Sequence, residues 1–154
     1  YLMADGTQDL RRLAKRFDAE VRRKRADQRA IHERLGARMQ AGVRGQIRGR
    51  INDAHGHVAG WQEKYIGSGG GYAAVRPTNS SSGPDSPGAI TNYLENGHAR
   101  RRPSGRAKRY RPRIKVLYVN GRGFYNAVRP TLARMLQSEV TRWGDEVATR
   151  LGGK

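Results

Sequence analysis

Apolar residues recur at helical spacing through the first third of the chain, and no other sequence feature limits the fold so strongly. Such spacing predicts one long amphipathic helix from about Thr7 to Asp53, with a narrow apolar stripe and a very basic back. A stripe this narrow on so long a helix indicates packing against a neighbouring subunit. The stripe consists of Leu10, Leu13, Phe17 and Val21, followed by Ile31, Leu35, Met39, Val43, Ile47 and Ile51.

Four glycines interrupt the second half of this pattern, at Gly36, Gly42, Gly45 and Gly49. A glycine inside a helix costs about 1 kcal/mol relative to alanine. We therefore expect a kink or a break between Gly36 and Gly49, and we treat residues 1–53 as one N-terminal segment.

The middle of the chain has the composition of a hairpin followed by a loop. Trp61–Ile66 and Tyr72–Val75 are short β-prone runs, and Gly67–Gly71 between them permits a turn. The glycine run lacks the Lys-Ser/Thr ending of a phosphate-binding loop, so the hairpin turn is the favoured interpretation. Pro, Gly, Ser and Asn then dominate residues 77–88, which predicts a mobile loop.

The last third of the chain contains a strand-like run and a helical pattern. Residues 114–119 are mostly apolar on both faces, which predicts a strand that is central in its sheet or shared between subunits. A stripe from Val128 to Leu151 predicts a helix from about Tyr125, ended by Gly152, in which Pro130 is tolerated only within the first turn. The stripe consists of Val128, Leu132, Leu136, Val140, Trp143, Val147 and Leu151.

These elements together predict an α+β fold. It has a long N-terminal helix, a small mostly antiparallel sheet, and a C-terminal helix packed on the sheet. Residues 54–154 form the α+β domain in this prediction, with mobile loops near residues 77–88 and 99–113.

The charge balance points to an anionic partner, since 31 Lys and Arg stand against 13 Asp and Glu, a formal net charge of +18. A basic arm after residue 99 can follow a phosphate backbone or an acidic protein face without reading sequence. A solvated loop, with an arginine excess set by a GC-rich genome, is the alternative. The cations of the arm are Arg100, Arg101, Arg102, Arg106, Lys108, Arg109, Arg111 and Arg113.

Candidate catalytic and metal-binding residues are few. The chain has no cysteine, which excludes disulfides and thiolate chemistry. His55 and His57 lack a third ligand at recognisable spacing, and Glu95 with His98 is a weak general acid–base pair. We therefore expect no enzyme, no metal and no cofactor. No apolar run approaches the roughly 18 residues that span a bilayer, so no membrane partner is expected.

Two short blocks, Thr91–His98 and Val119–Ala127, resemble the tail-component (neck, tail-completion) family of long-tailed siphophages. The resemblance implies a structural virion protein at the head–tail junction, assembled in the host cytoplasm as a ring, with a hexamer favoured. Other junction and tail proteins would be its partners, together with phage DNA in the channel. The motif residues carried over are Tyr93, Glu95, Gly97, His98, Gly121, Arg122 and Phe124.

The roles expected for these motif residues are architectural. Gly97 and Gly121 supply turns, Arg122 pairs with Glu95, and Phe124 anchors the final helix. Tail completion, tail termination and head closure remain equally open. The alternative function is a sequence-independent nucleic-acid-binding protein outside the virion.

Overall fold

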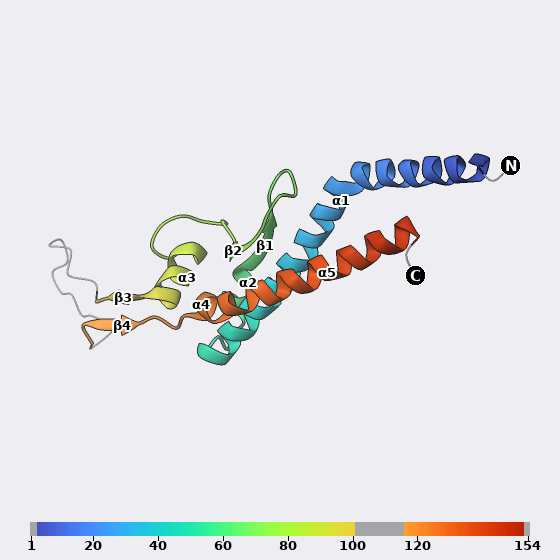
Figure 1. Cartoon of the computed structure of the whole chain (residues 1–154). Coiled ribbons are helices and arrows are strands. Elements are labelled where there is room, and N and C mark those ends of the chain that lie inside the picture. The colour runs from blue at the N-terminus through green and yellow to red at the C-terminus, as the bar shows by residue number, and fades with distance from the viewer. Residues whose placement is uncertain (1–2, 101–115, 153–154) are drawn as a thin grey trace. The chain divides into compact units, whose positions relative to one another are not determined.

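The computed structural model describes residues 3–100 and 116–152 (Figure 1). The chain forms two compact units, each built from separate stretches of sequence. The first, which we call the paired-helix unit, comprises Tyr1–Met39, Lys64–Ala74 and Thr131–Lys154. The second, which we call the motif unit, comprises Gln40–Glu63 and Val75–Pro130.

Helix α1 runs without interruption over 48 residues, Met3–Arg50. The long helix is confirmed, and no break interrupts it between Gly36 and Gly49; the alternative of a kink there stays a prediction. Four glycines cost about 4 kcal/mol of helix propensity. Val43 and Ile47, only 3% and 0% exposed, lie among those glycines. Burying two such side chains returns about 3–6 kcal/mol, which is enough to hold the helix together.

The predicted hairpin is present. A short helix α2 (His57–Trp61) leads into β1 (Gln62–Ile66), which pairs with β2 (Ala73–Pro77) in a two-stranded sheet. The connecting turn is closed by the Gly67 N–H, which donates to the Tyr72 carbonyl over 3.0 Å. Trp61 therefore ends a helix instead of starting a strand, and β2 extends two residues beyond the predicted Val75.

The predicted loop at residues 77–88 is shorter than expected. Its first residue belongs to β2, and its last two begin α3 (Pro87–Asn96). The Ser86 hydroxyl accepts a hydrogen bond from the Ala89 N–H over 3.2 Å, and Pro87 occupies the first turn, where its missing N–H has no cost. The mobility of residues 78–86 stays a prediction.

Strands β3 (Gly97–Ala99) and β4 (Tyr118–Asn120) form a second, antiparallel pair in which His98 lies opposite Val119. Of the strand predicted at residues 114–119, Tyr118 and Val119 lie in β4, whereas Val116 and Leu117 lie in a bend and are 56% and 74% exposed; residues 114 and 115 lie outside the described residues. Within the described residues β4 pairs only with β3, and a central position in a larger sheet stays a prediction. Pairing between subunits stays a prediction.

The predicted final helix is divided at its start. Helix α4 (Phe124–Val128) continues through a 3₁₀ turn, η1 (Arg129–Thr131), into α5 (Leu132–Leu151). Pro130 causes the division because it has no N–H for an α-helical hydrogen bond. Gly152 ends α5 with a φ of 100°, as predicted. The α+β fold class is confirmed, with a long first helix, small antiparallel sheets and a C-terminal helix.

The apolar core lies entirely in the motif unit. In the paired-helix unit the described buried residues are Gly36, Gly67, Gly70 and Glu139, and none of the apolar side chains described there is buried. Among the described residues the buried hydrophobic side chains of the core are Val43, Ile47, Val58, Ala59, Phe124 and Val128. No helix in the described part of the chain has the length and apolar character to cross a bilayer.

Candidate functional site

Helices α1 and α5 are joined inside the paired-helix unit by a ladder of polar contacts. Glu139 of α5 is 6% exposed and accepts hydrogen bonds from Arg34 Nε at 2.6 Å and from Arg38 Nη1 at 3.3 Å. The hydrogen bond from Arg34, with the second one from Arg38, holds the pKa of the Glu139 carboxyl below its usual value despite burial.

A second cluster joins the two helices farther along. Arg150 Nε lies 2.9 Å from both carboxylate oxygens of Glu20, and its Nη2 lies 2.7 Å from Asp27 Oδ2. Trp143 Nε1 donates to the same Asp27 oxygen over 3.0 Å, and Arg16 donates to the Leu151 carbonyl. Residues nearer the start of α1 contact residues nearer the end of α5, because Glu20 binds Arg150 whereas Arg34 binds Glu139. The two helices therefore run antiparallel.

An apolar row runs beside this ladder on each helix. On α1, Phe17 precedes Glu20 by three residues, and on α5, Leu136 precedes Glu139 by three. In antiparallel helices the same offset places both rows on the same side of the pair. We call this surface the apolar face. Its exposed members are Leu10 (68%), Leu13 (41%), Phe17 (51%), Val21 (72%), Leu136 (45%) and Val140 (42%).

The two family-like blocks meet in the motif unit, and Glu95 is the residue that joins them. Its Oε2 accepts a hydrogen bond from the Tyr125 N–H at 3.0 Å, and its Oε1 accepts one from the Asn126 N–H at 3.1 Å. Both N–H groups belong to the first turn of α4, where a carboxylate is favoured. Within the described residues Glu95 therefore caps a helix. The predicted ion pair between Glu95 and the Arg122 guanidinium is not formed there.

Two glycines allow the blocks to approach so closely. Gly97 has a φ of 83°, and a Cβ there would overlap the Val119 carbonyl oxygen. A Cβ at Gly121 would overlap the Glu95 carbonyl oxygen. The Arg122 N–H donates to the Leu94 carbonyl over 2.7 Å across the same junction. Glycine is required at both positions by space, and at Gly97 also by backbone conformation.

The aromatic motif residues divide between surface and core. Tyr93 is 41% exposed, and its ring centroid lies 5.5 Å from that of His98. Phe124 is fully buried, as expected of an anchor for the final helical segment. The adjacent Tyr125 hydroxyl donates to Gln62 Oε1. Burial, with the nearby charge of Glu95, raises the pKa of Tyr125 to about 12.

The basic arm falls almost entirely outside the described residues. Arg100 is half-buried, and its backbone N–H donates to the Leu117 carbonyl over 2.8 Å. The arrangement of the predicted anion-binding cations beyond Arg100 therefore lies outside the described residues. Those outside the described residues are Arg101, Arg102, Arg106, Lys108, Arg109, Arg111 and Arg113.

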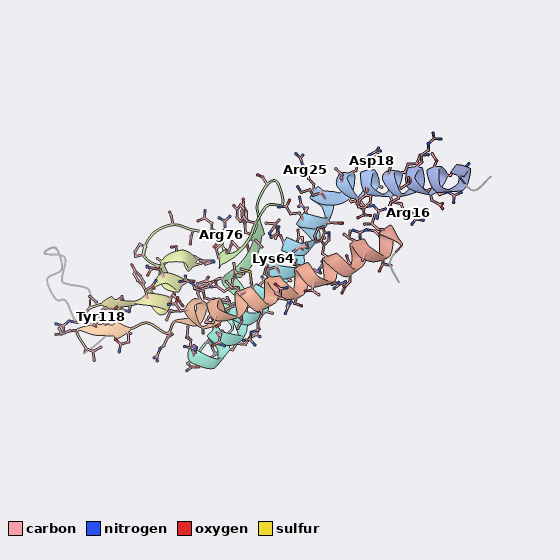
Figure 2. The ribbon with its side chains drawn as sticks, viewed as in Figure 1. Arg16, Asp18, Arg25, Lys64, Arg76 and Tyr118 are labelled. Atoms are coloured by element: carbon pink, nitrogen blue, oxygen red, sulfur yellow. The ribbon has the colours of Figure 1, made fainter. Side chains whose placement is uncertain are left out.

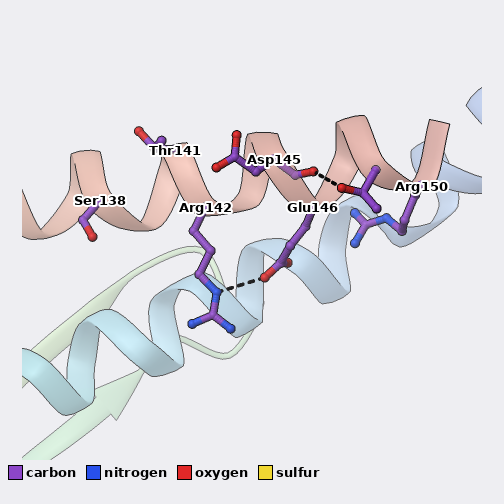
Figure 3. A pocket seen from close by; sticks show the side chains of 7 residues that line it. Ser138, Thr141, Arg142, Asp145, Glu146 and Arg150 are labelled. Carbon is purple, nitrogen blue, oxygen red and sulfur yellow. Dashed lines mark hydrogen bonds and ion pairs between the residues drawn. The ribbon is translucent and has the colours of Figure 1, made fainter. Parts of the chain in front are cut away.

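An open depression of about 610 Å³ lies along α5 (Figure 3). All of its lining comes from that one helix, between Ser138 and Arg150. Arg142 and Glu146 form an ion pair across one turn at 3.0 Å, and the Thr149 hydroxyl donates to the Asp145 carbonyl. Groups on a single helix face do not converge on a substrate as groups from several elements can.

The histidines and acids that the structure describes do not gather into a metal site, since no three of them come together as ligands. His55 and His57 have ring centroids 5.8 Å apart and stand without a third ligand group in that part of the chain. The apolar face and the Glu95 junction are therefore the two arrangements with a definite geometry. Comparison of the chain with protein-family models, with curated proteins and with solved structures found no match.

Proposed function

We propose that this chain is a structural virion subunit at the head–tail junction of a tailed phage, and that it assembles with copies of itself into a ring. The apolar face of the paired-helix unit is the observation that carries the proposal. Its α1 members Leu10, Phe17 and Val21 are each more than half exposed to solvent. A helix pair that fully buries none of its described apolar side chains gains stability when a neighbour completes its packing.

The size of the unsatisfied burial supports assembly. Covering a large apolar side chain contributes about 1.5–3 kcal/mol. The apolar face offers six such side chains in each copy, and each is more than 40% exposed. In a ring each copy presents the face to a neighbour, so this contribution recurs at every interface.

The Glu95 junction supports a structural role for the motif residues. Both carboxylate oxygens of Glu95 are occupied by N–H groups of α4, and both glycines are required by packing. Residues used in this way define a shape instead of a reaction centre, which fits the roles that the family resemblance implies. We propose on this basis that the chain is not an enzyme.

The proposed partners follow from the charge and the resemblance. Other junction and tail proteins would contact the ring, and the basic arm from Arg100 would meet DNA in the channel or an acidic protein face. A hexamer is the favoured ring. Portal, capsid and tail-tube genes beside the gene for this chain would support a place in the virion.

The ring is tested by native mass spectrometry and electron microscopy of the full chain. The wild type should form a closed ring, and F17D combined with V140D should form monomers, since each buries a charge in the interface. Ala26 is exposed on another side of α1, so A26D adds a charge to the same helix and should leave the ring intact. A wild type that stays monomeric at high micromolar concentration contradicts the proposal.

Ionic strength separates this function from the alternative, a nucleic-acid-binding protein outside the virion, which the net charge of +18 favours. Apolar assembly of copies this strongly charged should strengthen as salt screens their repulsion. Nucleic-acid binding should weaken steeply with salt and leave the free chain monomeric or dimeric.

A further inference from the structure

A row of cations runs along α1 on the side away from α5. It consists of Arg11, Lys15, Arg22 and Arg25, at spacings of four, seven and three residues, which place them on one helix face. All four are exposed. Within the described residues none of them forms a hydrogen bond or an ion pair. We call this surface the cationic row.

The acids of α1 are largely turned away from the cationic row. Glu20 and Asp27 bind Arg150 of α5, and their side chains are 14% and 21% exposed. Glu33 lies 2.7 Å from Lys64 of β1, whose hydrogen bond lowers the pKa of that carboxyl. Figure 2 shows Arg25 on the side of α1 away from α5 and Arg16 on the side next to it. Glu20, Asp27 and Glu33 are therefore engaged by other cations and do not neutralise the cationic row.

Asp18 is the one acid that remains in the row. It lies three residues after Lys15 and four before Arg22. Together with both of them it lines a shallow depression of about 550 Å³ on the surface of α1. The row therefore carries four positive charges and one negative charge.

We infer that the cationic row binds the phosphate backbone of nucleic acid, without reading its sequence. Arginine forms forked hydrogen bonds with phosphate oxygens, and three of the four cations are arginines. From Arg11 to Arg25 the row is about 21 Å long at the helical rise of about 1.5 Å per residue. Duplex DNA carries about one phosphate charge per 1.7 Å, so several phosphates lie within reach of the row.

The row suits nucleic acid better than an acidic protein. Protein interfaces centre on buried aromatic or aliphatic anchors, and the row itself contains none. It also lacks Asn and Gln, which read the edge of adenine, and its cations can follow the phosphate backbone without reading bases. The row and the apolar face occupy different sides of α1, and binding here does not rest on ring assembly.

The test measures binding of the full chain to a fluorescent 30-base-pair duplex of random sequence by anisotropy between 50 and 300 mM salt. The variant R11Q/R22Q/R25Q should bind at least tenfold more weakly, and its salt slope should fall by about 3, since each lost phosphate contact removes about 0.9. The matched control is R48Q/R129Q/R134Q, which removes three exposed arginines elsewhere. Its slope should fall by less than about 1.

A second pair of variants keeps the test independent of arginine loss. D18N removes the acid from the row and should raise duplex affinity about two- to fivefold. D145N, at an exposed acid of α5, should leave affinity unchanged. Helix content by circular dichroism should be the same in all variants.

Two results would overturn the inference. The first is an equal loss of affinity and salt slope in the two triple variants, because only total charge would then matter. The second is tighter binding to polyglutamate than to duplex of equal charge, lost in R11Q/R22Q/R25Q. That outcome would assign the row to an acidic protein.

Discussion

Glu139 of α5 accepts a hydrogen bond from Arg34 of α1 over 2.6 Å, and it is the buried acid that links the two helices. In the described part of the paired-helix unit no apolar side chain is buried to that degree. Ionic contacts therefore align α1 with α5, and the apolar side chains beside them stay exposed. Ionic contacts thus stabilise the helix pair, while its exposed apolar side chains are the ones proposed to bind a neighbouring copy.

Replacing Glu139 by Gln should weaken the paired-helix unit. The change leaves Arg34 and Arg38 without their carboxylate, although their side chains are 30% and 44% exposed and can turn to water. The expected loss in the free energy of unfolding is about 1–2 kcal/mol, measured by urea denaturation. E146Q removes an exposed ion pair with Arg142 on α5 and should cost under about 0.5 kcal/mol. Equal losses in the two variants would refute the special role of Glu139.

Acid should destabilise the same unit through Glu139. Its pKa in the folded state is lowered, mainly by the hydrogen bond from Arg34, from the usual 4.5. The stabilisation it provides is therefore complete above pH 4.5 and is lost as the pH falls through the lowered folded-state pKa. Melting temperatures between pH 2.5 and 7 should fall more steeply for the wild type than for E139Q. Glu33, with its pKa lowered by Lys64, should leave some acid dependence in the variant.

Helical periodicity predicted α1 and α5, because an amphipathic stripe is a local property of the sequence. It could not identify the surface against which each helix packs. Glu20 and Asp27 lie seven residues apart on α1, as do Trp143 and Arg150 on α5. The sequence therefore places each pair on one face of its helix. Only the fold shows that the two pairs meet.

The departures from prediction also have local causes. Pro130 divides the last helix because it has no N–H for an α-helical hydrogen bond, and a 3₁₀ turn stands at that point. Among the described residues of the apolar run, from Val116 to Val119, strand begins at Tyr118, where β3 lies alongside. At the candidate site the sequence indicated Glu95 but paired it with Arg122, because charge suggests an ion pair and cannot reveal a free helix end nearby.

Replacing Glu95 by Gln should loosen the junction between the two motif blocks. A carboxylate offers two acceptor oxygens to the Tyr125 and Asn126 N–H groups, whereas an amide offers one and loses the charge favoured at a helix start. The motif unit should lose about 1 kcal/mol, the usual value of a cap, in thermal or urea denaturation. E63Q, at an exposed acid of β1 in the same unit, is the control and should have no measurable effect.

Adding one methyl group at Gly97 or Gly121 should be far more damaging. The new Cβ at Gly97 would overlap the Val119 carbonyl, and at Gly121 the Glu95 carbonyl, so β3 and the Glu95 segment would have to move away from β4 and the turn that follows it. G97A carries a further cost because its φ of 83° is unfavourable for alanine. Hydrogen exchange at the Val119 and Arg122 amides should accelerate in both variants. Gly88, in α3, has open space around its missing Cβ, so G88A should leave exchange unchanged and stabilise its helix slightly. If G97A and G121A exchanged as slowly as G88A, the close approach of the two blocks would not be what holds the junction, and the architectural role assigned to these glycines would fail with it.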